Sequence, residues 1–195
     1  MLFRSLPLGL DDETLTAATV QLYKGDHLMI AGPPRAGRTT ALAALATTIR
    51  KLAPEARLIA VSPRPSPLQL HPALADVART TEALPDLSSA AWTVVLVDDA
   101  EELEHAGSLT EPIEARSRSL TVIAAGRTDA LRVAHRHWTK SLRNARRGVI
   151  LRPFDASEGD VLGVRLPRGA RPFRQPGRGY LVDGATISLI QLATD

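Results

Sequence analysis

The segment from Leu28 to Leu52 constrains the fold of this chain more than any other. A short apolar run, LMIA, is followed by the loop GPPRAGRT and then by Leu42, Leu45 and Ile49. Apolar residues three or four positions apart predict one face of a helix. Two glycines with four residues between them let the backbone between strand and helix curl tightly. The segment therefore predicts a strand, a curled loop and a helix in direct succession.

The loop has the spacing of a phosphate-binding loop. Glycines let the backbone N–H groups of such a loop point at phosphate oxygens, and the helix N-terminus adds the positive end of its dipole. Thr39 is placed to offer its hydroxyl to Mg²⁺. A Gly/Pro turn without a ligand is the alternative. The residues predicted to contact a nucleotide are Gly32, Pro33, Pro34, Arg35, Ala36, Gly37, Arg38, Thr39 and Thr40.

Arg38 stands where this type of loop normally carries lysine. Lysine reaches the terminal phosphates as a compact charge on a thin stem, whereas arginine carries a bulky planar fork. Arginine keeps the positive charge and binds phosphate in bidentate fashion. Because a small misplacement is costly in phosphoryl transfer, we predict that binding survives better than hydrolysis.

A second motif lies about sixty residues further along. The run Val94–Val97 is continuous and apolar, as in a strand buried on both faces, and it ends in Asp98 and Asp99. Asp98 is predicted to hold Mg²⁺ through water, and Asp99 is the candidate to orient or deprotonate the attacking water. Asp99 is one methylene shorter than the glutamate often found there. The alternative is a core strand whose acids cap the next helix.

Strand-like and helix-like segments alternate along the chain. This alternation predicts an α/β fold with a mostly parallel sheet and helices on both faces. The sequence Asp183-Gly184 between two apolar runs predicts a C-terminal β-hairpin. The predicted core strands are 28–31, 58–61, 94–97, 120–125 and 149–151. The predicted helices are 39–52 and segments near 72–80, 108–118 and 128–146.

Composition excludes disulfide bonds, thiolate chemistry, cysteine-ligated zinc and a membrane-spanning apolar run. The 195 residues are 44% apolar, include no cysteine and only seven aromatic residues, and contain no apolar run long enough to span a bilayer. Residues 126–195 carry 13 basic and 6 acidic groups, a net charge of +7, and 130–154 carry seven basic groups and no acid. This basic stretch fits either a polyanionic partner or a solvated helix face. With mixed charge overall and few aromatics, DNA is not the favoured partner.

With both motifs in place, the chain resembles the FtsK/SpoIIIE branch of RecA-like P-loop ATPases. Within it, the sequence is similar to the degenerate C-terminal ATPase module of the type VII secretion ATPases of the EccC type. The resemblance covers nearly all of residues 1–195, as one domain. It rests on LPLGLDDETL (6–15), AGPPRAGRTTAL (31–42), VVLVDDAEEL (94–103), VIAAGRTDALR (122–132), GDVLGVRLP (159–167) and PGRGYLV (176–182).

The resemblance implies ATP and Mg²⁺ as ligands, and a module excised from a longer chain. In that family the modules stand in tandem on one cytoplasmic chain behind a membrane anchor, which this sequence does not include. Neighbouring modules and the signal segment of a secreted protein are the implied partners, and a homo-oligomer stays open. Active members carry lysine, Asp-Glu and a polar sensor where this chain has Arg38, Asp98-Asp99 and Gly126.

These departures predict a module that binds ATP and hydrolyses it weakly or not at all, and that docks an export substrate. A DNA-translocating motor domain and a nucleotide-free scaffold are the alternatives. Arg127 follows the missing sensor and is a candidate contact to phosphate or a neighbour, with a solvated helix-start arginine as the alternative. Arg178, in a Pro-Gly-Arg-Gly turn, either contacts nucleotide or marks the entry to the hairpin.

Overall fold

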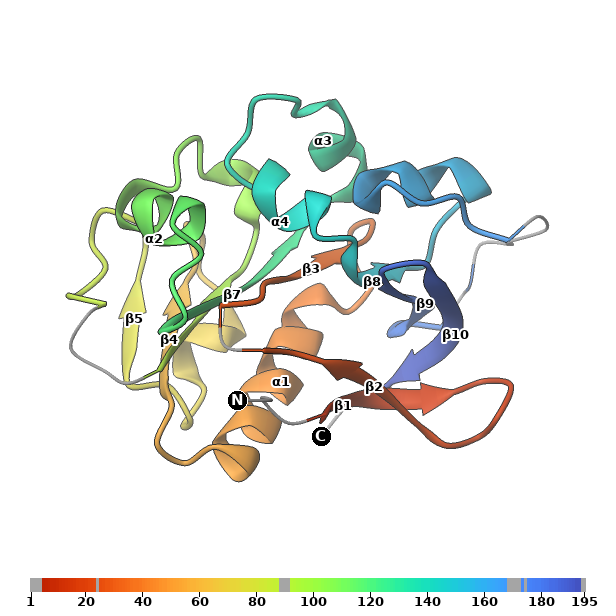
Figure 1. Ribbon diagram of the computed structural model, residues 1–195, viewed down its shortest axis with the longest axis horizontal. Helices are drawn as coiled ribbons and strands as arrows, with labels where there is room; N and C mark the ends of the chain where they lie inside the picture. Colours follow the sequence, from red (N-terminus) through yellow and green to blue (C-terminus); the bar gives the residue numbers. More distant parts are fainter. Residues whose placement is uncertain (1–4, 24, 88–91, 168–172, 174, 194–195) are drawn as a thin grey trace.

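The strands of this protein form one ten-stranded sheet in the part of the chain that the computed structural model describes, residues 5–23, 25–87, 92–167, 173 and 175–193 (Figure 1). The order across the sheet is β2-β1-β10-β9-β8-β3-β7-β6-β4-β5. The six strands from β8 to β5 run parallel, and the pairings from β2 to β8 are antiparallel. The strands are β1 (Ser5–Asp11), β2 (Ala17–Gln21), β3 (Leu28–Ala31), β4 (Arg57–Val61), β5 (Asp76–Ala78), β6 (Thr93–Val97), β7 (Leu120–Gly126), β8 (Arg147–Leu151), β9 (Arg178–Asp183) and β10 (Thr186–Leu192).

Helices cover both faces of the parallel strands, as the sequence predicts for this α/β fold (Figure 1). The α-helices are α1 (Arg38–Leu52), α2 (Thr110–Glu114), α3 (Thr128–Val133) and α4 (Lys140–Asn144). The 3₁₀ turns are η1 (Pro67–Leu70), η2 (Ala100–Glu102), η3 (Gly107–Leu109) and η4 (Ala156–Leu162). None of the helices in the described residues is long and apolar enough to cross a membrane.

Alternation of side chains along β3 divides the core into two layers. Leu28 and Ile30 pack with the apolar face of α1, whereas Met29 and Ala31 pack with α2, α3 and α4 on the other face. All four residues are buried, because a parallel strand covered on both sides has no polar face. The long helix and the short helices therefore fix β3 from opposite sides, and its carboxyl end is held rigidly.

Two of the predicted helices are wrong in detail. Residues 72–80 contain β5 instead of a helix, because 76–78 pair in parallel with 59–61 of β4. Residues 128–146 form two short helices, not one. The chain between them turns so that the His137 and Trp138 rings both contact the Leu103 carbonyl oxygen, at 2.8 and 2.9 Å.

The C-terminal hairpin is confirmed. Strands β9 and β10 pair from Arg178–Gln191 to Asp183–Thr186, which leaves Gly184 and Ala185 as the turn. The hairpin joins the parallel strands by the pairing of β9 with β8, and β10 continues into β1 and β2. The start of the chain thus extends the sheet beyond the hairpin, with β2 at the edge.

Candidate functional site

The loop between β3 and α1 leaves the carboxyl end of a central strand. Strand β3 lies between β8 and β7, at the point where the order in which strands are added across the sheet reverses. Ligands of open α/β sheets bind at such a point. Gly37 has φ +96° just before the helix, a left-handed conformation that favours glycine. Arg35 adopts φ +60° within the loop, which is uncommon for a residue with a side chain. The loop is therefore tightly curled.

The start of α1 presents unpaired backbone donors. Among the described residues, none accepts a hydrogen bond from the N–H groups of Gly37, Arg38, Thr39 or Thr40, and the first backbone bond of the helix is Ala41 N–H to the Gly37 carbonyl at 2.9 Å. Such groups, together with the dipole of a 15-residue helix, attract an anion. The geometry fits a phosphate group of a nucleotide at this helix end.

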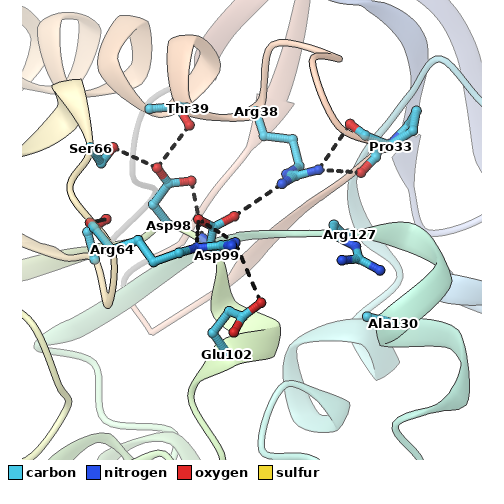
Figure 2. Close-up of polar contacts among 12 residues, drawn as sticks. Pro33, Arg38, Thr39, Arg64, Ser66, Asp98, Asp99, Glu102, Arg127 and Ala130 are labelled. Atoms are coloured by element: carbon cyan, nitrogen blue, oxygen red, sulfur yellow. Dashed lines mark hydrogen bonds and ion pairs between the residues drawn. The ribbon is translucent and has the colours of Figure 1, made fainter.

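Arg38 does not extend away from the loop but folds back onto it (Figure 2). Its Nη1 donates to the carbonyl oxygens of Gly32 at 2.6 Å and Pro33 at 3.0 Å. Its Nη2 donates to Oδ1 of Asp99 at 3.1 Å. The side chain is only 11% exposed, so these are buried, charge-assisted contacts. Arg38 thus ties the first residues of the loop to the acidic end of β6.

Asp98 and Thr39 meet, as expected for the two predicted Mg²⁺ ligands. Thr39 Oγ1 donates to Asp98 Oδ2 at 2.9 Å, and Ser66 Oγ donates to the same oxygen at 2.8 Å. Asp98 is 2% exposed, so its carboxylate is held in one place. Hydroxyl and carboxylate oxygens suit Mg²⁺, which usually keeps several waters and takes one or two protein oxygens. The residues present therefore fit that ion.

Asp99 is fully engaged by arginines. While Arg38 donates to Oδ1, Arg64 donates to Oδ2 through Nε at 3.1 Å and lies 3.0 Å away through Nη2. The backbone of Asp99 has φ +48°, a strained conformation for a residue other than glycine. Arg64 also approaches Glu102 at 3.5 Å. Both carboxylate oxygens of the residue predicted to act on water are thus already hydrogen-bonded.

Arg127 and Arg178, two predicted contacts, lie apart from this cluster. Arg127 forms a two-pronged ion pair with Asp129 at 2.8 and 3.1 Å, which raises the pKa of Arg127. Arg178 pairs with Asp12 of the turn between β1 and β2, and its guanidinium lies 5.5 Å from the Phe173 ring centroid. Among the residues described, neither arginine contacts the loop. Their role toward a nucleotide stays a prediction.

Three site residues were missed by the sequence reasoning: Arg64, Ser66 and Glu101. Arg64 and Ser66 lie in the proline-rich segment that follows β4, and Glu101 lies in η2 after β6. A signal for them existed, because the carboxyl ends of parallel strands meet at one edge of the sheet. Glu101 stands two residues beyond the acidic pair Asp98-Asp99.

A small cavity of about 180 Å³ adjoins the loop on the side of the C-terminal strands. Its walls include Gly37 and Thr40 from the start of α1, and Pro176, Gly177 and Leu192 from the hairpin side. The Gly177 N–H donates to the Ala36 carbonyl at 2.9 Å, which holds the two walls together. The cavity therefore lies beside the unpaired N–H groups at the start of α1.

The basic stretch 130–154 is largely committed to the fold. Arg143 donates to the carbonyls of Leu131 and Ala134, each at 2.7 Å. Arg147 pairs with Asp26 and with Asp183. Only part of the positive charge that the sequence suggests is therefore free for a partner. A wide cleft of about 940 Å³ between α3, α4 and η4 is lined by Arg132, Lys140, Arg143 and Arg146 of this stretch, with Lys140 and Arg146 exposed at its surface.

The fold is that of RecA-like P-loop ATPases, with the loop between β3 and α1 and the acids after β6 at one edge of the sheet. No protein-family model matches the chain, and no curated protein matches it at a significant level.

Solved structures with the same fold include type VII secretion ATPases. The chain is similar to Thermomonospora curvata EccC, ATPases 2 and 3 in complex with a signal sequence peptide, at 20% identity and TM-score 0.75, over 98% of this chain and 40% of that one. It is similar to the cytoplasmic domain of EssC at 18% identity and TM-score 0.76, over 97% and 44%. The pCW3 conjugation coupling protein TcpA with ATPγS matches at 13% identity and TM-score 0.68, over 98% and 66%.

These likenesses confirm the fold, and with it the structural resemblance to EccC and EssC that the sequence predicts. At identities below 25% they show the fold alone. The chain spans less than half the length of the EccC and EssC chains it matches.

Proposed function

We propose that this chain is an ATP-binding module of a type VII secretion ATPase of the FtsK/SpoIIIE branch, with weak or no hydrolysis. The observation that carries the proposal is the position of Arg38. Its guanidinium is bound to two carbonyls of its own loop and to Asp99, while the N–H groups at the start of α1 are unpaired. The loop is therefore built to accept phosphate, but its charged residue is held away from the terminal phosphate.

Binding is supported by the remaining parts of the site. Phosphate would lie against the N–H groups of Gly37, Arg38 and Thr39, and Mg²⁺ would be held near Thr39 and Asp98. The bound ion would neutralise phosphate charge. These groups take their geometry from the left-handed Gly37 and from the buried Asp98, and not from the identity of the residue at position 38.

Weak hydrolysis is supported by the absence of three forms of transition-state support. Arg38 is engaged, Asp99 has both oxygens bound to arginines, and Gly126 offers no polar side chain. One preorganised electrostatic contact is worth about 3–4 kcal/mol in a barrier, or 10²–10³ in rate. The effects need not add, since such groups act as a unit.

The role in export rests on the likeness to EccC and EssC. EccC ATPases 2 and 3 have been solved with a signal sequence peptide, and other similar structures are described as cytoplasmic domains. By analogy this module would dock a secreted protein, contact neighbouring ATPase modules of the same chain, and lie in the cytoplasm behind a membrane anchor outside this sequence. Assembly as a homo-oligomer belongs to the same proposal.

Calorimetry of Mg-ATP binding tests the proposal. Thr39→Val removes the hydroxyl assigned to Mg²⁺, and it should weaken Mg-ATP binding about tenfold without changing affinity measured in EDTA. Thr19→Val on β2 is the matched control, because Thr19 is exposed, lies outside the loop and has no side-chain hydrogen bond among the described residues. It should bind as the wild type does. No binding at millimolar nucleotide would leave only the scaffold alternative.

A further inference from the structure

We propose that Glu101, and not Asp99, is the carboxylate that faces the γ-phosphate end of the loop and takes the proton of the attacking water in any residual hydrolysis. This inference rests on the proposed function, because it requires ATP to bind in the loop. It follows from the placement and partners of the two carboxylates.

Asp99 is unsuited to act on water. Each of its oxygens is hydrogen-bonded to an arginine, Oδ1 to Arg38 and Oδ2 to Arg64. Its side chain is 18% exposed, and it holds Arg38 against the loop. A proton on Asp99 would break one of these charge-assisted hydrogen bonds, which are about twice as strong as neutral ones. The task of Asp99 is therefore structural.

Glu101 is placed differently. Both of its carboxylate oxygens are buried, and the backbone N–H groups of Glu101 and Arg127 approach them only outside normal hydrogen-bond geometry. A Cβ atom added to Gly126 would lie 2.8 Å from Glu101 Oε2, so the carboxylate fills the space that a sensor side chain would take. The Gly126 carbonyl accepts the Gly32 N–H at 3.2 Å, so this space adjoins the first residue of the loop.

Arg38 also has a buried polar group without a hydrogen-bond partner among the described residues. Its Nε–H is also buried and unpaired among the described residues, and Arg38 interacts electrostatically with Glu101. A buried donor and a buried acceptor that lack partners are costly, since each forfeits its hydrogen bonds to water. A water molecule, or a phosphate oxygen with a water, satisfies both groups. In this proposal, the ligand that satisfies both groups lies at the γ-phosphate end of the loop.

The charged groups around Glu101 are consistent with a proton acceptor. The pKa of Glu101 is raised, chiefly by burial and also by the Asp99 charge. Nearby backbone N–H groups and the Arg38 charge lower the pKa by less than burial raises it. Arg64 and Arg127 also lie within electrostatic range. An acceptor with a raised pKa is better matched to proton transfer near neutral pH than an ordinary carboxylate.

In the proposed step, water hydrolyses the bond between the β- and γ-phosphates of ATP. The water oxygen forms a bond to the γ-phosphorus while the bond from that phosphorus to the β,γ-bridging oxygen breaks, and ADP leaves. One water proton goes to the Glu101 carboxylate. Glu101 then returns the proton to the released phosphate or to solvent, and the site is regenerated without any oxidant or further reactant.

The test compares Glu101→Gln with Glu102→Gln. Glu102 is the matched control, because it is the next residue of η2, is exposed, and pairs only with Arg64 in the described structure. Removing a negative charge beside the γ-phosphate should strengthen Mg-ATP binding about tenfold relative to Mg-ADP. General acid–base groups contribute 10²–10⁴ in rate, so Glu101→Gln should lower phosphate release by about a hundredfold. Glu102→Gln should change neither quantity more than about twofold.

Several results would overturn the inference. Equal changes in ATP and ADP affinity, or no change, would mean that Glu101 does not face the γ-phosphate. Phosphate release that survives Glu101→Gln but is lost in Asp99→Asn would return the role to Asp99.

If Glu101→Gln does not fold, Glu101→Asp serves instead, and we expect lower phosphate release with an unchanged ATP-to-ADP affinity ratio. If the wild type binds ATP and the ATP-to-ADP affinity ratio is unchanged in Glu101→Gln, this inference alone is contradicted. A wild type that binds no ATP contradicts the proposed function as well.

Discussion

Arg38 Nη2 lies 3.1 Å from Asp99 Oδ1, and this contact joins two of the three residues at which the sequence departs from the pattern of active P-loop ATPases. These two departures are therefore one structural unit and not two independent losses. Asp99 receives Arg38 on one oxygen and Arg64 on the other. A change at either position alters the surroundings of the other, so their effects are expected to be coupled.

Replacing Arg38 by lysine alone is expected to restore little activity. A lysine ammonium is a compact charge, and Asp99 would still be held by Arg64 while Gly126 would still lack a polar side chain. Phosphate release should change less than about tenfold. Adding Gly126→Gln would force the Glu101 carboxylate to move, because the new Cβ would lie 2.8 Å from Oε2. A large recovery in Arg38→Lys, measured by phosphate release, would show that residue 38 alone limits turnover.

Arg38 is also expected to stabilise the folded chain. Arg38→Met removes three buried hydrogen bonds and leaves the Gly32 and Pro33 carbonyls without this donor. Hydrogen bonds to charged groups contribute about 1.5–3 kcal/mol, so the free energy of unfolding should fall by about 2 kcal/mol. Urea denaturation measures it. Arg35→Met is the control, since that exposed side chain has no hydrogen bond or ion pair among the described residues and the change should cost less than about 0.5 kcal/mol.

Stability should fall in mild acid because of His27. This histidine is 8% exposed, its Nδ1 accepts the Val122 N–H at 3.1 Å, and burial lowers its pKa from 6.5 to about 4. The folded state therefore holds His27 neutral while the unfolded state binds a proton below pH 6.5. Its contribution is present above pH 6.5 and is lost between pH 6.5 and 4. The loss is on the order of 3 kcal/mol.

His27→Asn isolates this effect. The asparagine side-chain oxygen keeps an acceptor for the Val122 N–H and does not titrate. Urea denaturation from pH 7 to pH 4 should show a shallower fall in the free energy of unfolding for this variant than for the wild type. Parallel curves would mean that other groups account for the acid sensitivity.

Duplex DNA is expected to bind weakly or not at all at physiological salt. Arg143 and Arg147 are committed to carbonyls and carboxylates of the chain, which leaves Lys140 and Arg146 at the cleft surface. A DNA titration over a range of salt concentrations measures this. Retention near 0.15 M salt that is lost in Lys140→Gln with Arg146→Gln, but not in Lys51→Gln on exposed α1, would favour the DNA-motor alternative.

The sequence predicted those parts of the fold that depend on local pattern. The continuous apolar runs of β3, β6 and β7 indicate strands that are buried on both faces. The spacing of Leu42, Leu45 and Ile49 in α1 indicates a helix that is buried on one face. The segment 72–80 misled because its apolar residues suit a helix or a short strand. Only the pairing of β5 with β4 decides between them, and that pairing is a long-range property.

The same limit applies to the site. The motifs predicted that Thr39 and Asp98 would meet, because each sits at a fixed place after a strand. They did not predict that Arg38 would turn back to Gly32 and Pro33, or that Arg64 would occupy Asp99. Side-chain direction depends on the neighbours that the fold supplies. Arg127 and Arg178 show this most clearly. Arg127 pairs with Asp129, two residues along the same turn, and Arg178 pairs with Asp12, which only the tertiary structure brings close.

The most direct test of the central claim pairs two measurements on the wild-type chain: Mg-ATP affinity by calorimetry and phosphate release at saturating ATP. The account predicts binding at or below millimolar nucleotide together with turnover far slower than about one per second, the low end for kinases. Turnover near that rate or faster would contradict it, because Arg38 would then be a competent substitute for lysine despite its contacts with the loop and Asp99.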